Sequence, residues 1–146
     1  MGAMDPSHER EEEVRVLFVE DDPSVSQMYK LKLELDGYSV TVAEDGETAL
    51  SLAPEMQPDI VFLDIRLPKL DGLTVLERLR QDSRTRSIPV VILSNYSERE
   101  LVDRGLKLGA LEYLVKSQTT PARLAGGVEG WLSVRAEETE GRERPA

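Results

Sequence analysis

Asp64 stands at a chemically unusual place in the sequence. It directly follows the apolar run Ile60–Leu63 and precedes a loop that contains Pro68 and Gly72. A short, uninterrupted apolar run that is rich in β-branched and aromatic residues predicts a buried strand. A carboxylate at the end of a buried strand is costly unless another group there compensates its charge. The sequence therefore has to supply a partner for Asp64.

Polar side chains follow the other apolar runs in the same way. If these runs are parallel strands of one sheet, ligands bind beyond their carboxyl ends, near the point where the strand order reverses. In the order 2-1-3-4-5 the first and third strands are neighbours, so the acidic residues that follow them converge. The residues expected at this edge are Glu20, Asp21, Asp22, Asp64, Ser94, Asn95 and Lys116.

The carboxylates of Glu20, Asp21 and Asp64 form the centre of this expected site. At a separation of about 5 Å, each pair repels by roughly 3 kcal/mol at an effective dielectric constant near 20. The cluster therefore needs a cation, or one member must stay protonated. The chain has no cysteine and a single histidine, His8, near its start. Oxygen-only ligands favour a hard ion, which is Mg²⁺, Mn²⁺ or, less well, Ca²⁺.

A lysine and a hydroxyl beside such an ion suit a phosphoryl group. Lys116 supplies a compact positive charge and Ser94 an O–H donor for phosphoryl oxygens. Together with the carboxylates they predict phosphoryl transfer onto an aspartate, which gives an acyl phosphate. Each residue alone also has a structural explanation; Asp22 and Asp71, for example, are good helix caps. The combination, rather than any single residue, carries the hypothesis.

The elements that position these residues alternate along the chain. Apolar runs typical of strands alternate five times with amphipathic stretches typical of helices. This pattern predicts an α/β fold, a (βα)5 doubly wound parallel sheet of five strands in the order 2-1-3-4-5. The predicted strands are 14–19, 38–43, 59–63, 88–93 and 111–115, and the predicted helices are 23–36, 46–56, 72–80, 97–108 and 121–135.

Residues 30–42 also fit a second interpretation. The apolar residues alternate on both sides of Asp36 and Gly37, as in a β-hairpin. We favour a helix for the first half, because Asp22 and Pro23 form a good helix start and Gly37 a good stop. The apolar arc that this helix would turn toward the core comprises Val25, Met28, Tyr29, Leu31, Leu33 and Leu35. Farther along, Ser97 and Glu100 fit a capping box for the fourth helix.

Composition narrows the class of protein. The formal charge of −10, from 18 basic and 28 acidic residues, disfavours binding to nucleic acid or anionic membranes. No apolar run could cross a bilayer, no signal peptide is recognised, and the lack of cysteine suits the reducing cytoplasm. We expect one domain at 14–136. It would lie between an expression scar with a disordered acidic N-terminal segment, 1–13, and a charged C-terminal tail, 137–146.

Four segments closely resemble the receiver domain of two-component response regulators. They are VLFVEDDPSV, VFLDIRLPKLDG, IPVVILSNY and LGALEYLVKS, and the resemblance runs from Val14 to Arg135. It implies the flavodoxin-like fold of the chemotaxis receiver, whose strand order is the one expected above. It also implies Asp64 as the phosphoacceptor. The ligands of the metal, Mg²⁺ or alternatively Mn²⁺, would be Glu20, Asp21, Asp64 and the backbone carbonyl of Arg66.

The resemblance further implies a switch. Ser94 and Lys116 would contact the phosphoryl group, and Ser94 and Tyr113 would change conformation together. The affected face would be formed by the fourth helix, the fifth strand and the fifth helix. The phosphoryl donor would be a histidine kinase or a histidine phosphotransfer protein, and the face would bind an output partner or a second copy. The chain would be a signalling switch and not an enzyme.

Three departures from the family pattern bear on function. Lys116 is followed by Ser117, where the family usually has a cis proline, so this loop is expected to be built differently. Asn95 replaces a small residue and would narrow access to Asp64. Arg66 and Tyr96 occupy positions that tune the lifetime of the acyl phosphate, and their bulk suggests slow hydrolysis.

Three other functions were compared with this hypothesis. A flavodoxin-like FMN carrier is disfavoured because Glu20, Asp21 and Asp22 would repel the cofactor's phosphate. A haloacid-dehalogenase-type phosphatase would need an Asp-x-Asp pair after the first strand, which is absent. A receiver-like interaction module that is not controlled by phosphorylation remains the alternative.

Overall fold

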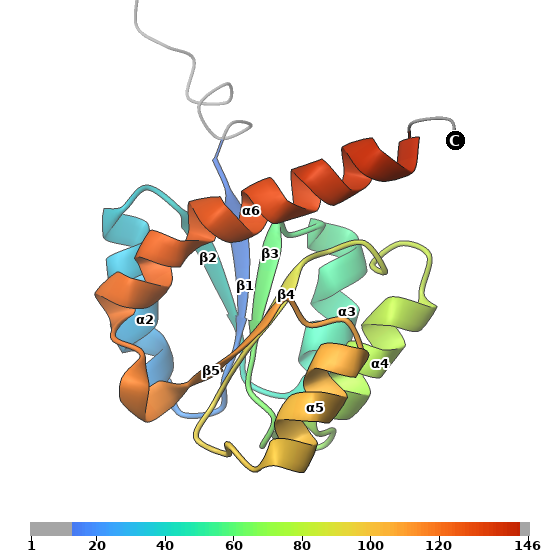
Figure 1. Ribbon diagram of the computed structural model, residues 1–146. Helices are drawn as coiled ribbons and strands as arrows, with labels where there is room; N and C mark the ends of the chain where they lie inside the picture. Colours follow the sequence, from blue (N-terminus) through green and yellow to red (C-terminus); the bar gives the residue numbers. More distant parts are fainter. Residues whose placement is uncertain (1–12, 144–146) are drawn as a thin grey trace, which may run out of the picture.

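Five parallel strands form the centre of the protein, and helices cover both faces of the sheet (Figure 1). The computed structural model describes residues 13–143, with side chains for residues 13–134. The strands are β1 (Arg15–Val19), β2 (Ser39–Ala43), β3 (Ile60–Leu63), β4 (Val90–Ser94) and β5 (Glu112–Val115). The helices are α2 (Pro23–Leu35), α3 (Gly46–Met56), α4 (Gly72–Gln81), α5 (Arg99–Lys107) and α6 (Pro121–Glu143), with a 3-10 turn, η1 (Lys116–Gln118).

The strand order is β2-β1-β3-β4-β5, and all neighbouring pairs are parallel. This confirms the predicted doubly wound α/β fold. The register pairs Val19 with both Ala43 and Leu63, so β1, β2 and β3 end at the same level. The residues that follow these strands are therefore brought to one edge of the sheet.

Alternating side chains of the strands feed two apolar layers. Leu17 and Val19 of β1 pack in the layer under α3 and α4, while Val16 and Phe18 pack in the layer under α2 and α6. Strands covered on both sides read as continuous apolar runs, as β3 and β4 do. No helix in the described part of the chain combines the length and the apolarity that a membrane span requires.

Helix α2 confirms the helical interpretation of residues 23–36 but buries a narrower face than predicted. Tyr29 and Leu33 lie in the core. Met28, Leu31 and Leu35 are 49%, 62% and 73% exposed, so their predicted core positions are wrong. A helix that lies on a sheet covers it with only one stripe of side chains, and the apolar arc was too wide to fit within that stripe.

Helix α5 begins later than predicted. Its first residue is Arg99 and its N-cap is Glu98, without a side-chain cap hydrogen bond, so the capping box at Ser97 is wrong. The preceding loop is held by tertiary contacts instead. The N–H of Tyr96 donates to Oγ of Ser94 at 3.2 Å, and its carbonyl accepts from the Tyr113 hydroxyl.

Helix α6 ends at Glu143, beyond the predicted end at Arg135. The added residues are mainly alanine, glutamate and arginine, which are strong helix formers. Part of the segment interpreted as a charged tail is therefore helical. The predictions for residues 1–12 and 144–146 lie outside the described residues.

The loop after β3 returns so closely to its own strand that only glycine fits at position 72. The N–H of Gly72 donates to the carbonyl of Ile65 at 2.7 Å. A Cβ atom at this position would lie 2.0 Å from the carbonyl oxygen of Asp64 and 2.8 Å from Cα of Ile65. Both are backbone atoms, so they cannot move aside as a flexible side chain could.

Substitution of this glycine should therefore destabilise the fold. We expect Gly72→Ala to lower the free energy of unfolding by about 2–3 kcal/mol, because the added methyl group forces the backbone apart. Gly126→Ala is the matched control, because a Cβ there meets nothing within 4 Å and the helix gains propensity. Urea denaturation followed by the fluorescence of the single tryptophan, Trp131, measures both. Equal stability of Gly72→Ala and wild type would contradict the expectation.

Candidate functional site

The three predicted carboxylates meet at the carboxyl edge of the sheet. One side-chain oxygen each of Glu20, Asp21 and Asp64 lies within 4.8 Å of the other two. Backbone hydrogen bonds carry the sheet one residue past the strand ends, from Glu20 N to Ala43 O at 2.9 Å and from Asp64 N to Val19 O at 3.1 Å. The same backbone that ends the strands therefore holds two of the carboxylates.

Lys116 joins this cluster from the far edge of the sheet. Its ammonium donates to Oδ2 of Asp64 at 2.7 Å and forms an ion pair with Oε1 of Glu20. Glu20 and Asp64 are buried, only 2% and 5% exposed, whereas Asp21 is exposed. If all groups are ionised, three carboxylates and one ammonium leave a net charge of −2.

Burial and pairing act in opposite directions on these groups. Burial raises the pKa of Glu20 above its usual value, although hydrogen bonds from Lys116 and from the N–H of Asp22 partly offset this. The N–H of Asp22 donates to Oε2 of Glu20 at 3.0 Å. Burial would lower the pKa of Lys116, but its hydrogen bonds to Asp64 and Glu20 outweigh it and raise the pKa. The negative charge of the cluster is thus only partly compensated.

Asp22 is adjacent to the cluster but has another role. Its side chain caps α2 by accepting from the N–H of Ser24 at 2.9 Å, and it also accepts from the Ser24 hydroxyl at 2.7 Å. These hydrogen bonds lower its pKa. Asp71 caps α4 in the same way through Thr74. Both residues thus have the capping role that the sequence suggested.

The donor set fits a hard divalent cation. All three side chains offer oxygen, and the cluster has the excess negative charge that such an ion would balance. In octahedral Mg²⁺ coordination neighbouring ligands lie about 3 Å apart and opposite ligands about 4 Å, so the three oxygens, which lie within 4.8 Å of one another, have to draw closer around the ion. Oε1 of Glu20 is fully buried beside the Lys116 ammonium, but within the described part of the chain this ion pair is not accompanied by a hydrogen bond of good geometry.

Ser94, Tyr96 and Tyr113 form a second group beside the carboxylates. Ser94 is the last residue of β4 and is fully buried. Its Oγ accepts from the N–H of Tyr96, while the Tyr113 hydroxyl donates to the Tyr96 carbonyl. Burial raises the pKa of Tyr113, and a hydrogen bond with Ser94 partly opposes that rise. The two predicted switch residues, Ser94 and Tyr113, are thus linked through the backbone of Tyr96.

The residues expected to tune the lifetime of an acyl phosphate lie at the rim. Arg66 and Tyr96 are exposed, and the guanidinium carbon of Arg66 lies 4.4 Å from the centroid of the Tyr96 ring. Such a cation–π contact holds the two side chains together. Asn95, between Ser94 and Tyr96 in sequence, is also exposed.

The loop after Lys116 is built without a cis peptide bond, since every described peptide bond is trans. Residues 116–118 form the 3-10 turn η1, and Oγ1 of Thr119 closes the turn by donating to the carbonyl of Val115 at 2.8 Å. The buried hydroxyl of Tyr29 donates to the Thr119 carbonyl at 2.5 Å. The sequence placed Tyr29 in the core but did not indicate this hydrogen bond, for which the available cue is that a buried hydroxyl needs a partner.

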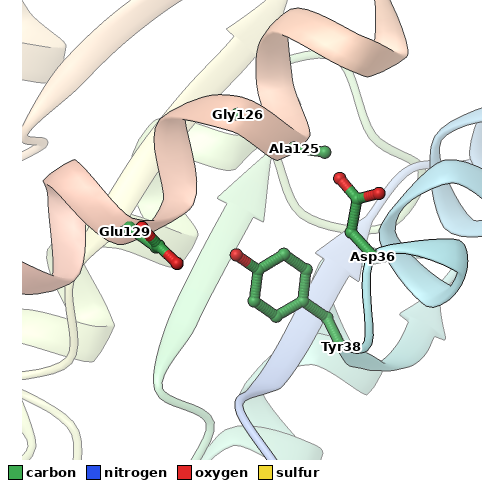
Figure 2. Close-up of a pocket in the computed structure, with 5 residues that line it drawn as sticks. All are labelled: Asp36, Tyr38, Ala125, Gly126 and Glu129. Atoms are coloured by element: carbon green, nitrogen blue, oxygen red, sulfur yellow. The ribbon is translucent and has the colours of Figure 1, made fainter.

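A pocket of about 360 Å³ lies between the end of α2 and α6 (Figure 2). It is lined by Asp36, Tyr38, Ala125, Gly126 and Glu129, none of which belongs to the predicted site. The Tyr38 hydroxyl points toward Glu129. Burial, and to a lesser extent the charges of Glu129 and Asp36, raise the pKa of Tyr38. The pocket is separate from the residues expected to do chemistry.

Comparison with known proteins relates this geometry to a family. Residues 16–127 match the family described as the response regulator receiver domain. Over 102 residues the chain is 43% identical to the DNA-binding dual master transcriptional regulator RpaA of Synechocystis sp.. That match covers 70% of this chain but only 42% of the regulator, so the chain spans less than half of the regulator's length.

Solved structures agree. A putative response regulator from Chloroflexus aurantiacus is 33% identical, with a TM-score of 0.78 over 84% of this chain and 99% of that one. The BeF3-activated N-terminal receiver domain of Klebsiella pneumoniae RstA is 32% identical, with a TM-score of 0.73 over 81% and 97%. By family match, sequence identity and fold, this chain belongs to the receiver domains of response regulators.

Proposed function

We propose that Asp64 accepts a phosphoryl group from a phosphohistidine and that the domain works as a phosphorylation switch. Receiver domains of response regulators are signalling switches rather than enzymes. The observation that carries the proposal is the contact of Lys116 with two buried carboxylates beside a third, exposed one. An ammonium and a metal-binding acidic cluster at one aspartate are what phosphoryl transfer onto that aspartate needs.

Glu20, Asp21, Asp64 and the backbone carbonyl of Arg66 would hold Mg²⁺, or Mn²⁺. When bound, the ion neutralises phosphoryl oxygens and orients the group for attack. An oxygen of Asp64 forms the new bond to phosphorus while the phosphorus–nitrogen bond to the donor histidine breaks. The electron pair stays on the leaving imidazole, which takes up a proton from solvent. Lys116, already on Asp64, contacts the oxygens of the product.

Switching would follow from the new charge on Asp64. A phosphoryl group carries about −1.5 to −2 charges and three acceptor oxygens, which favour donation by the Ser94 hydroxyl and Lys116. Ser94 also interacts with Tyr96 and Tyr113. A change at Ser94 therefore biases Tyr113 and the surface of α5, β5 and α6, through the different contacts that the two states make.

The partners follow from this function. The donor would be a histidine kinase or a histidine phosphotransfer protein in the cytoplasm. The surface of α5, β5 and α6 would bind an output partner or a second copy. Direct binding to nucleic acid or membranes is disfavoured by the formal charge of −10. The alternative is an interaction module that phosphorylation does not control.

Intact-protein mass spectrometry distinguishes these two functions. After incubation with Mg²⁺ and acetyl phosphate, we expect the mass of one phosphoryl group to be added. Asp64→Asn should take up none, because the nucleophilic carboxylate is gone, and chelation of the metal should abolish uptake by the wild-type protein. Wild-type protein that stays unmodified under all conditions would favour the interaction module.

Mg²⁺ binding can be measured without any phosphoryl donor. At a Mg²⁺ concentration about ten times its Kd, the free energy of unfolding should rise by about 1.4 kcal/mol, which thermal denaturation detects as a higher Tm. Asp21→Asn should lose most of this effect, because one ligand charge is removed. Asp22→Asn should keep it, since asparagine also caps helices and Asp22 is not in the cluster. Equal stabilisation of Asp21→Asn and wild type would refute the assigned metal site.

The contact between Arg66 and Tyr96 should prolong the life of the acyl phosphate. We expect Tyr96→Ala to shorten its half-life severalfold, because water then reaches Asp64 more easily. Tyr96→Phe keeps the ring that contacts Arg66 and should retain the wild-type lifetime. The loss of the phosphorylated mass with time, after removal of the donor, reports both rates. An unchanged half-life in Tyr96→Ala would exclude this shielding role.

A further inference from the structure

Lys116 contacts carboxylates that follow strands not adjacent to its own strand, β5. It follows β5, at the edge of the sheet, whereas Asp64 follows β3 and Glu20 follows β1. Strand β4 lies between β5 and β3. Glu112, Tyr113 and Val115 of β5 are only partly buried or exposed, so packing alone holds this edge weakly. The direction of the Lys116 side chain therefore depends on how the backbone after β5 is fixed.

A single 3-10 turn fixes this backbone locally. The N–H of Thr119 donates to the carbonyl of Lys116 at 3.2 Å, and Oγ1 of Thr119 donates to the carbonyl of Val115 at 2.8 Å. Thr119 is only 5% exposed. Thr119 therefore holds the carbonyl groups of both Val115 and Lys116, which fixes the backbone on either side of the Lys116 Cα atom. Three-residue 3-10 turns have poor intrinsic hydrogen-bond geometry, so this turn needs a tertiary support.

Tyr29 supplies that support. The side chain is 2% exposed, and its hydroxyl donates to the carbonyl of Thr119 at 2.5 Å. Its ring stacks on Phe18, with centroids 5.5 Å apart and an angle of 24° between the planes. Phe18 lies in β1, two residues before Glu20. Tyr29 therefore connects the turn that carries Lys116 to the strand that carries one of its two carboxylate partners.

We propose that Tyr29 is a positioning residue, which holds the turn after β5 so that the Lys116 ammonium contacts Glu20 and Asp64. The role of Lys116 in phosphoryl transfer rests on the proposed function, but its placement by Tyr29 does not. Without the tyrosine hydroxyl, the buried Thr119 carbonyl loses its tertiary donor. The turn then samples other conformations and Lys116 leaves the carboxylates more often.

Trace labelling of lysines with acetic anhydride, read by peptide mass spectrometry, measures this placement directly. In the wild-type protein Lys116 should react slowly, because its side chain is 13% exposed and engaged by two carboxylates. In Tyr29→Phe we expect its labelling rate to rise about 2- to 10-fold, the equivalent of one hydrogen bond. Lys30, on the same helix as Tyr29, and Lys69 should keep their rates. A general loosening of the protein would raise the rate of the half-buried Lys30 as well.

Matched variants test the specificity. Tyr38→Phe also removes a tyrosine hydroxyl, but from the pocket between α2 and α6, and should leave Lys116 labelling unchanged. Thr119→Val removes the side-chain donor to Val115 while keeping the branched shape, and should raise Lys116 labelling as Tyr29→Phe does. Thr119→Ser restores the hydroxyl and should restore slow labelling. The pair at Thr119 thus tests whether the turn itself holds Lys116, whereas Tyr29→Phe tests the tertiary support of that turn.

The rate of phosphoryl transfer provides a second measurement. The initial rate of Asp64 phosphorylation by acetyl phosphate should fall in Tyr29→Phe by a factor similar to the rise in labelling, while stabilisation by Mg²⁺ persists. If wild-type protein takes up no phosphoryl group, the proposed function fails, yet a rise in Lys116 labelling still supports the positioning role. Unchanged Lys116 labelling in Tyr29→Phe would overturn the inference, whatever the results at Thr119 and in the phosphorylation assay.

Discussion

The Lys116 ammonium, in contact with the buried carboxylates of Glu20 and Asp64, is the interaction on which the rest of the site depends. A buried ion pair seldom adds net stability, because desolvation of its charges offsets their attraction. Here one ammonium faces three carboxylates, and burial raises the pKa of Glu20 despite its pairing. A cluster with this imbalance is poorly explained as a device for stability. It is consistent with the proposed binding of a divalent cation and a phosphoryl group at this site.

The fold supports this interaction by fixing where the strands end. The register of β1 and β3 brings Glu20 and Asp64 level, and hydrogen bonds beyond the strand ends hold both residues. Gly72 lets the following loop press against the carbonyl of Asp64, where any side chain would collide. The carboxylate side of the site is thus rigid. Lys116 comes from a half-exposed edge strand, and its placement depends on tertiary contacts of a short turn.

The sequence was sufficient for the parts of the site that follow from strand order. Glu20, Asp21, Asp64 and Lys116 could be predicted to meet, because parallel strands bring their carboxyl ends to one edge. Contacts between residues far apart in the chain could not be predicted, because they leave no local pattern in the sequence. Tyr29 and Thr119 are 90 residues apart, and nothing near either one indicates the other. The same limit explains the start of α5, where tertiary contacts of Tyr96 override a good capping sequence, and the orientation of α2, whose apolar arc is wider than the stripe it buries.

The charges of the site indicate which strand would move if Asp64 were phosphorylated. Phosphorylation replaces the single charge of Asp64 by a phosphoryl group with about two, so the attraction for cations grows while Glu20 gains nothing. If Asp64 is phosphorylated as proposed, Lys116 would be drawn toward the phosphoryl oxygens and away from Glu20. Strands β1 and β3 have a hydrogen-bonded neighbour on each side and resist displacement, whereas β5 has only β4. We therefore expect β5, which also carries Tyr113, to take up any movement that follows. With Lys116 placed after an edge strand, a local change of charge at Asp64 would reach the surface formed by α5, β5 and α6.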